Sequence, residues 1–192
     1  MNPVPRAMPH DPDIHHRRSI RLKGYDYSRA GACFITICTR ARECILGDMV
    51  GGEIRLNEYG TIVRDERLIL PNRYPNTELD AFIVMPNHIH AIIVIHHVVR
   101  NDAKHPRTML IPKIVGYVKM NSAKRINRSR GTPGARVWQR NYHEHVVRND
   151  ADLARIRKYI DGNPCKWHMD SDNTRNTRPQ RQRPPAQRQQ AD

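Results

Sequence analysis

Residues 81–95, AFIVMPNHIHAIIVI, constrain the fold more than any other stretch of this chain. Two runs rich in β-branched and apolar residues flank Pro86 and Asn87, a pair typical of a turn. We therefore predict two strands within residues 79–95, joined at this pair. Because both runs are so apolar, we expect them to be a central strand pair, buried in a sheet.

The rest of the chain alternates between strand and helix patterns. Asn57 is predicted to cap a helix that Pro71 stops, and Asn163 and Pro164 are predicted to end the last helix. The predicted order is a strand at 31–39, a hairpin at 45–56, a helix at 57–70, the strands within 79–95, a helix at 109–129, a strand at 137–147 and a helix at 150–163.

Without the hairpin and the last helix, this order is βαββαβ. It is typical of an α+β, ferredoxin-like antiparallel sheet with helices on one face. We predict such a palm with an added hairpin and a C-terminal helix. Residues 19–170 are expected to form its single domain, between a flexible segment, 1–18, and a disordered basic tail, 171–192.

The charge of the chain predicts a polyanionic partner. The 192 residues carry a net charge of +14, and nucleic acid is the commonest partner of so basic a protein. No apolar run approaches the roughly 20 residues of a membrane-spanning helix, and the N-terminal residues lack the apolar segment of a secretory signal. The four cysteines lack zinc-site spacing. We expect a cytoplasmic, nucleoid-associated protein with no membrane partner.

His88 and His90 are the first candidates for chemistry. In a strand, residues two apart face the same side, with their Cα atoms about 7 Å apart. Two imidazoles at this spacing can hold one divalent cation, whereas the alternative is a histidine pair on the solvent side of a sheet. A second pair, His143 and His145, flanks a charged residue, so its strand is less clearly buried on the other face.

Tyr159 and Asn163 are the second candidates. They lie four residues apart on a predicted helix and therefore share a face. One interpretation is a phenolic nucleophile beside an amide oxygen that binds a metal. The other is a half-buried aromatic followed by a C-terminal cap. A phenol with a pKa of about 10 needs a cation or a base nearby to act as a nucleophile at neutral pH.

The segments VMPNHIHAIIVI and VWQRNYHEHVVRNDADLARIRKYIDGNP together resemble the single-tyrosine HUH transposases. The opening RRSIRLKGYDYSRAGACFITICT resembles the REP-associated tyrosine transposase branch of the IS200-like transposase family. The resemblance extends over residues 17–168. It implies that Tyr159 is the nucleophile and that His88, His90 and Asn163 bind Mg²⁺ or Mn²⁺. It also implies that single-stranded DNA is cleaved and rejoined at hairpin-forming palindromic repeats, through a 5′-phosphotyrosine intermediate.

Three basic segments are predicted to contact DNA, because positive charge suits phosphates and interleaved aromatics suit stacking on unpaired bases. They are residues 17–28, residues 103–143 and, within the latter, the aromatic segment 138–142. Residues 103–143 include ten Lys or Arg and no Asp or Glu. The predicted DNA contacts are Arg17, Arg18, Arg21, Lys23, Tyr25, Lys113, Lys119, Lys124, Arg125, Arg128, Trp138 and Arg140.

Two other functions fit the same residues. A non-catalytic protein that binds a nucleic-acid sequence or hairpin on this fold would ignore both chelators and the loss of the Tyr159 hydroxyl. A metal-dependent hydrolase that uses water would still cleave DNA without that hydroxyl. The sequence is equally compatible with a monomer and with a homodimer.

Overall fold

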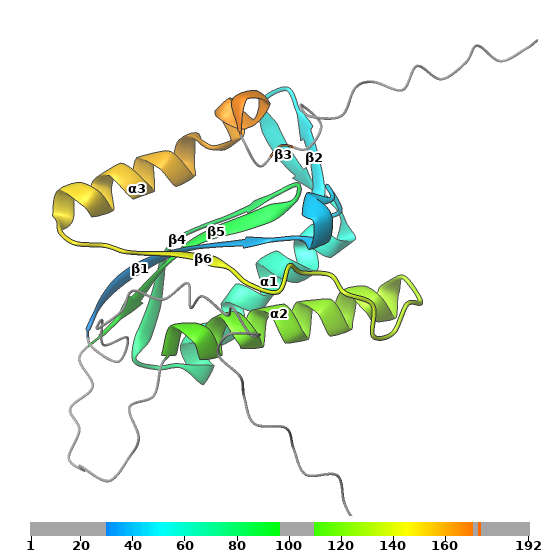
Figure 1. Cartoon of the computed structure of the whole chain (residues 1–192), viewed down its shortest axis with the longest axis horizontal. Helices are drawn as coiled ribbons and strands as arrows, with labels where there is room; N and C mark the ends of the chain where they lie inside the picture. Colours follow the sequence, from blue (N-terminus) through cyan, green and yellow to red (C-terminus); the bar gives the residue numbers. More distant parts are fainter. Residues whose placement is uncertain (1–29, 97–109, 171–172, 174–192) are drawn as a thin grey trace, which may run out of the picture.

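The computed structural model describes residues 30–96, 110–170 and 173 (Figure 1). Its centre is a four-stranded antiparallel sheet in the order β4-β5-β1-β6, which confirms the ferredoxin-like prediction. β5 lies inside the sheet as predicted, whereas β4 is an edge strand, because β5 takes β1 as its second partner. The strands are β1 (Gly31–Cys38), β4 (Thr77–Met85), β5 (His88–Ile95) and β6 (His143–Val146).

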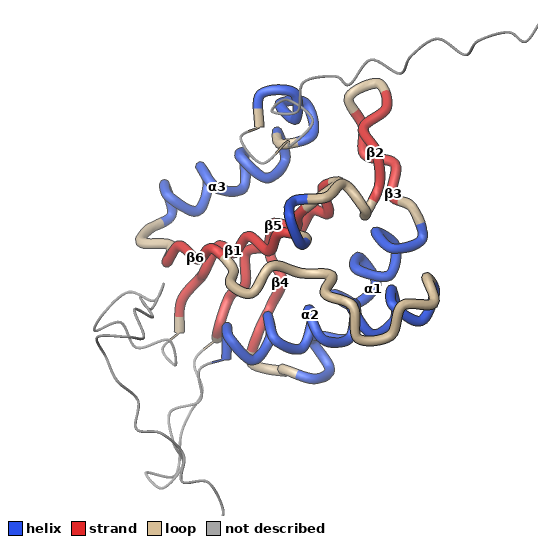
Figure 2. The backbone as a smooth tube through the Cα atoms, turned by 45° about the vertical axis from the view of Figure 1, so that its right-hand side comes forward, coloured by secondary structure: helices blue, strands red, loops and turns tan. Residues whose placement is uncertain are grey.

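Helices cover both faces of the sheet (Figure 2). Helices α1 (Glu58–Arg73) and α2 (Leu110–Ser129) lie on one face, and α3 (Asp150–Gly162) lies on the other. The prediction of helices on one face is therefore confirmed for α1 and α2, while the added C-terminal helix buries the second face. Within the described residues, no helix is both long and apolar enough to span a membrane.

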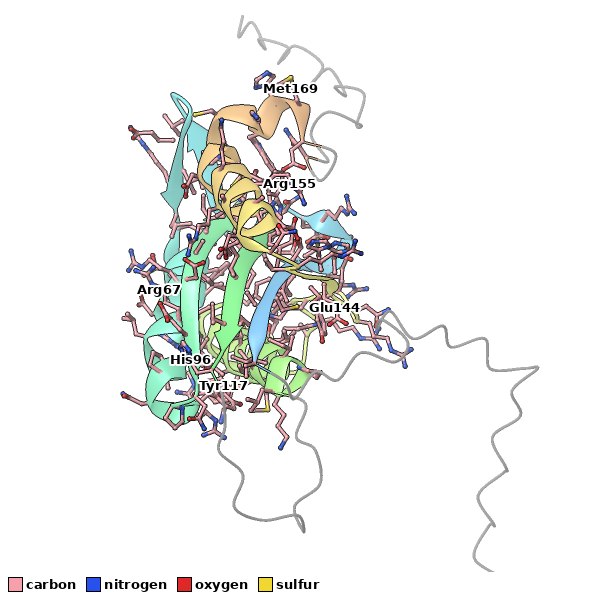
Figure 3. The ribbon with its side chains drawn as sticks, turned by 90° about the vertical axis from the view of Figure 1, so that its left-hand side faces the viewer. Arg67, His96, Tyr117, Glu144, Arg155 and Met169 are labelled. Atoms are coloured by element: carbon pink, nitrogen blue, oxygen red, sulfur yellow. The ribbon has the colours of Figure 1, made fainter. Side chains whose placement is uncertain are left out.

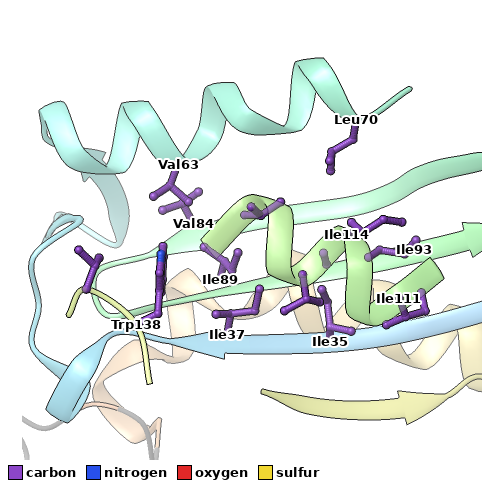
Figure 4. Close-up of a cluster of buried hydrophobic side chains, with 14 of the residues drawn as sticks. Ile35, Ile37, Val63, Leu70, Val84, Ile89, Ile93, Ile111, Ile114 and Trp138 are labelled. Atoms are coloured by element: carbon purple, nitrogen blue, oxygen red, sulfur yellow. The ribbon is translucent and has the colours of Figure 1, made fainter. Parts of the chain in front are cut away.

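Alternation along β5 separates two hydrophobic clusters. Ile89 and Ile93 belong to the larger cluster, which lies between the sheet and helices α1 and α2 (Figure 4). Ile92 belongs to the smaller one, where it packs with Ile156 and Ile160 of α3. Because both faces of β5 are covered, every second residue of this strand lies beneath α3.

The hairpin and the start of α1 form as predicted. β2 (Gly47–Val50) and β3 (Glu53–Leu56) make a separate two-stranded sheet. Gly51 and Gly52 turn it with φ of 61° and 82°, the positive values that a tight hairpin requires. The side chain of Asn57 caps α1, since its Oδ1 accepts a hydrogen bond of 3.0 Å from the backbone N–H of Gly60.

Two predicted helix ends were wrong in detail. α1 continues through Pro71 to Arg73, because Pro71 lies in the last turn and the backbone N–H of Tyr74 still closes that turn on the Leu70 carbonyl. α3 does end before Pro164, but Asn163 keeps α-helical angles (φ −61°, ψ −42°). The chain continues as a 3-10 helix, η2 (Pro164–Met169). The pre-proline preference for extended angles is overridden here.

The strand predicted at 137–147 is much shorter in the structure. Only β6 pairs as a ladder, and residues 139–141 are held instead by the Lys119 ammonium group, which donates to their backbone carbonyls. Before them, Trp138 packs into the larger cluster and its indole N–H donates to Ser122 Oγ at 3.0 Å. Side-chain contacts and one isolated backbone bridge, between Thr39 and Trp138, replace a continuous ladder in this segment.

The predicted flexible segment 1–18 lies outside the described residues. So does the predicted basic tail 171–192, except for Asn173, whose amide donates to the Trp167 carbonyl at 3.0 Å.

Gly60 offers a test of the packing between α1 and the segment before β2. A Cβ at this position would lie 2.0 Å from the carbonyl oxygen of Leu46. Gly60→Ala should therefore lower the free energy of unfolding by about 1–3 kcal/mol, as overpacking does. Gly116→Ala on α2 is the control, because nothing lies within 4 Å of its added Cβ, and it should stabilise by about 0.5–1 kcal/mol. Urea denaturation measures both, and equal effects would contradict this account.

Candidate active site

His88 and His90 project from β5 toward α3 and η2. They are 0% and 2% exposed, so the alternative of a solvent-facing pair does not hold. The His90 ring lies 5.3 Å from the Tyr159 ring of α3, and the His88 ring lies 6.0 Å from the Trp167 ring of η2. The two Nε2 atoms are 3.0 Å apart. The histidines therefore point their outer nitrogens at one place.

Each imidazole is oriented through its other nitrogen. His90 Nδ1 lies 2.8 Å from Thr36 Oγ1, and His88 Nδ1 lies 2.8 Å from Asn87 Oδ1. Asn87 Nδ2 donates to the Arg42 carbonyl at 3.0 Å, which fixes the orientation of the amide. Asn87 Oδ1 can only accept, so His88 Nδ1 carries the proton and Nε2 presents a lone pair. Such partners typically orient metal-binding histidines.

Burial keeps His88 neutral. Burial, together with a smaller effect of the positive charge of Arg42, lowers the pKa of His88 from 6.5 to about 4. Neutral imidazole is the form that binds metal ions.

Tyr159 of α3 packs beside the histidine pair of β5. Its hydroxyl lies 3.4 Å from His90 Nε2, and its ring meets the Phe34 ring edge-on at 6.0 Å. The side chain is 46% exposed, so it is half-buried, as the alternative of an aromatic residue before a helix cap also predicts. The hydroxyl can be reached from solvent while its position is held by Phe34 and His90.

Asn163 is buried without satisfying its amide. The residue is 2% exposed, and neither Oδ1 nor Nδ2 has a hydrogen-bond partner. Such a group costs roughly 1–3 kcal/mol. It lies four residues after Tyr159, which contacts His90, and four before Trp167, which contacts His88. Along the chain, Asn163 therefore lies midway between the two residues that contact the histidines, and among the described residues its side chain makes no capping bond.

These residues fit a divalent ion. Among the described residues, no three His, Cys, Asp or Glu side chains group to bind a metal, so a third ligand would have to be of another type. Two Nε2 atoms 3.0 Å apart can both lie about 2.1 Å from one ion, and the buried amide oxygen of Asn163 is of the type that could supply a third donor. Three neutral ligands leave coordination positions open for a substrate, as catalytic sites require.

A cavity of about 580 Å³ lies beside Tyr159 and His90. Among the described residues, its wall contains no Asp or Glu. Just behind the wall, Asp152 accepts hydrogen bonds from His145 and Arg155, which hold the pKa of its carboxyl at about 2. The cavity is lined by Phe34, Thr36, Cys38, Arg42, His90, Gln139, Asn141, Tyr142, His143, His145, Arg155, Ile156 and Tyr159.

Several of these residues were not predicted from the sequence. Thr36 meets His90 only because β1 pairs with β5, and Arg42 and Arg155 reach the cavity from a turn and from α3. His143 and His145 did carry a signal, since they form the second His-x-His pair. They line the cavity because β6 pairs with β1 so that His143 lies opposite Thr36.

The predicted DNA contacts are scattered. α2 covers the face of the sheet opposite to α3, and Figure 3 shows Arg155 of α3 and Tyr117 of α2 well apart. Lys113, Lys124 and Arg128 are exposed on α2, away from the cavity. Arg140 is exposed between two cavity residues. Arg17, Arg18, Arg21, Lys23 and Tyr25 lie outside the described residues.

Three of the predicted DNA contacts have structural roles. Trp138 is 7% exposed and packs in the larger hydrophobic cluster, so the structure gives it a role in the core. Lys119 was expected to meet phosphates, but its ammonium group donates to the carbonyls of residues 139–141. Arg125 donates to the buried Glu66 carboxylate at 2.9 Å, so its charge is already partly compensated.

The lowered pKa of His88 predicts how stability depends on pH. The unfolded chain binds this proton near pH 6.5 and the folded chain only near pH 4. The contribution of neutral, buried His88 to the free energy of unfolding is therefore complete above about pH 6.5. It is lost as the pH falls toward 4, and the total loss is up to about 3 kcal/mol. The Asp152 carboxyl, whose pKa is lowered to about 2, takes up its proton only below this pH range.

His88→Gln should flatten the fall in the free energy of unfolding over this range, measured by urea denaturation with a chelator. His143→Gln, at an exposed position on β6, is the control and should keep the wild-type profile. A wild-type slope in His88→Gln would refute the assignment.

Comparisons with known proteins agree with this geometry. The family model described as "Transposase IS200 like" matches residues 72–163. An uncharacterized protein of Haemophilus influenzae is 37% identical over 167 residues, which cover 82% of this chain and 93% of that protein. A "Putative REP-associated tyrosine transposase" of the same organism is 29% identical over 148 residues, with 73% and 74% covered.

The fold also matches a solved structure. A REP-associated tyrosine transposase bound to a REP hairpin superposes with a TM-score of 0.53 at 22% identity, over 77% of this chain and 73% of that one. The span of the family model includes His88, His90, Tyr159 and Asn163. This chain belongs to the IS200-like transposase family.

Proposed function

We propose that this protein cleaves and rejoins single-stranded DNA beside hairpin-forming palindromic repeats, through a metal-dependent reaction with a 5′-phosphotyrosine intermediate. One observation carries the proposal. The Tyr159 hydroxyl lies 3.4 Å from Nε2 of a buried histidine pair, on the wall of a cavity without acidic residues. This is the arrangement that a phenolic nucleophile for a phosphate requires.

In the proposed reaction, Tyr159 Oη attacks the phosphorus of one phosphodiester. The Oη–P bond forms while the P–O3′ bond breaks. The Tyr159 phenol loses its proton to solvent and the departing 3′ oxygen gains one from solvent, so it leaves as a hydroxyl and no net proton is consumed. The 5′ end stays on the protein. Attack by this 3′ hydroxyl, or by another one, reverses the step, so the strands are rejoined without an external energy source.

The chain's own residues would do most of the positioning. His88, His90 and Asn163 would bind Mg²⁺ or Mn²⁺, which when present supplies charge stabilisation for the phosphate. Asn87 and Thr36 hold the two imidazole rings. In phosphoryl transfer, such alignment and charge stabilisation account for most of the rate enhancement.

Hairpin DNA is the substrate that the comparisons favour. The relative of similar fold is bound to a REP hairpin, and this chain's charge of +14 suits DNA. Because Tyr159 meets His90 of its own chain, one chain is sufficient to assemble the site, and we propose that a monomer can cleave. DNA that also contacts α2 would have to pass around the sheet to its other face.

A covalent-adduct assay tests the nucleophile. Labelled single-stranded hairpins from repeats beside the gene are incubated with protein and Mn²⁺ and resolved on denaturing gels. Wild type should retain label, and Tyr159→Phe should lose it by more than about a hundredfold, because the nucleophile is gone. Tyr142→Phe is the matched control, since Tyr142 lines the same cavity.

Two outcomes would contradict the proposed mechanism. Cleavage that survives Tyr159→Phe would indicate water as the nucleophile. Tight hairpin binding without any cleavage, indifferent to chelators, would indicate a non-catalytic binding protein.

Mn²⁺ binding tests the ligand set without relying on cleavage. Asn163→Ala and His90→Ala should each weaken Mn²⁺ binding at least about tenfold, measured by calorimetry. Asn163→Ala should change the stability of the metal-free protein little, because the amide makes no hydrogen bond there. Asn141→Ala, an exposed amide on the cavity wall, is the control. Wild-type Mn²⁺ affinity in Asn163→Ala would remove Asn163 from the ligand set.

A further inference from the structure

The turn after β1 has an unusual backbone. Ala41 (φ 52°, ψ 19°) and Arg42 (φ 53°) are consecutive left-handed residues, and neither is glycine. Such angles cost free energy for residues with a Cβ and persist only where the surroundings impose them. Both lie within η1 (Arg40–Arg42), which connects β1 to the segment before the hairpin.

Buried hydrogen bonds impose this conformation. Asn87 Nδ2 donates to the Arg42 carbonyl at 3.0 Å. Thr39 binds the Asn87 carbonyl twice, through its backbone N–H at 2.8 Å and its Oγ1 at 3.0 Å. Thr39 and Asn87 are both 0% exposed. The backbone N–H of Arg40 donates to the Val137 carbonyl at 2.7 Å, so both ends of the turn are anchored.

The same asparagine orients the histidine pair. Asn87 Oδ1 accepts from His88 Nδ1, while Nδ2 of the same amide holds the strained turn. The position of Arg42 is therefore tied, through one side chain, to the position of His88.

The strained turn contributes a cationic residue to the wall of the cavity. Arg42 lines it together with His90 and Tyr159. The other arginine of the wall, Arg155, is already paired with Asp152. A turn that only connected strands could use glycine at 41 and 42 and avoid the strain. Guanidinium groups bind phosphate with two parallel hydrogen bonds, and a fixed backbone sharpens that geometry.

We propose that residues 39–43 form a phosphate-binding turn, in which Arg42 binds one phosphodiester group of the strand that enters the cavity and Asn87 positions the turn relative to His88. This inference rests on the proposed function, because DNA in this cavity is the ligand. Arg42 is the binding residue, and Asn87 is a positioning residue.

The test measures binding alone. It uses Tyr159→Phe protein with a chelator, so neither the nucleophile nor a metal contributes. Fluorescence anisotropy reports the affinity for single-stranded hairpin probes, each with one methylphosphonate, which removes the charge of a single phosphate. Arg42→Asn is the main variant, because asparagine tolerates left-handed angles and the turn can keep its shape. Arg40→Asn is the matched control, exposed in the same turn and outside the cavity wall.

The expected effect is specific to one phosphate position of the DNA probe. Arg42→Asn should weaken binding of the unmodified probe at least about tenfold, and Arg40→Asn by less than about threefold. One methylphosphonate should weaken binding to the Tyr159→Phe protein by the same factor as Arg42→Asn, and should have no further effect in Arg42→Asn. The proposal would be overturned by equal losses in Arg42→Asn and Arg40→Asn, or by an effect of that same methylphosphonate that persists in Arg42→Asn.

Asn87→Ala tests the positioning role. It should abolish the discrimination against that one methylphosphonate while other probe positions keep their wild-type differences, which a general loss of stability would not produce. Retained discrimination would overturn the role of Asn87. The adduct assay gives an independent result. If no adduct forms, but Arg42→Asn and the one methylphosphonate weaken binding as expected, the cleavage reaction is refuted while the phosphate-binding turn is supported.

Discussion

The burial of β5 on both faces is the constraint on which the site depends. One face packs against α1 and α2 through residues such as Ile89 and Ile93, and the other lies beneath α3. His88 and His90 occupy the second face and lose almost all contact with solvent. Burial disfavours their charged forms, lowers the pKa of His88, and makes a hydrogen bond to each Nδ1 necessary. Asn87 and Thr36 supply those bonds.

The site is also where the polar interior is least satisfied. Buried polar side chains are almost always hydrogen-bonded, yet both amide atoms of Asn163 have no such partner. Ala41 and Arg42 add backbone strain at the edge of the same region. The strained residue Arg42 lines the cavity together with Tyr159, and the unsatisfied amide of Asn163 follows Tyr159 by four residues. Backbone strain of this kind is typical of functional sites.

The positive charge of the chain serves two purposes in the structure. Lys119 and Arg125 hold neighbouring segments, one by binding backbone carbonyls and the other by pairing with buried Glu66. Arg42 lines a cavity whose wall, among the residues that the structure describes, has no carboxylate. A high net charge therefore identifies a polyanionic partner in general, but it does not identify which cations meet that partner.

The sequence by itself determined the order of strands and helices, the capping role of Asn57, the hairpin at Gly51 and Gly52, and the two His-x-His pairs. These depend on local periodicity and turn chemistry, which neighbouring residues encode. It also placed Tyr159 and Asn163 on one helical face.

Only the tertiary structure decided which residues surround them. The pairing of β1 with β5 brings Thr36 to His90, and the packing of α3 on the second face brings Tyr159 to the same histidine. Tertiary packing also places Trp138 in the core and Arg42 on the cavity wall. These contacts join segments 50 or more residues apart, and no local pattern records such pairings, because they arise from burying both faces of one sheet.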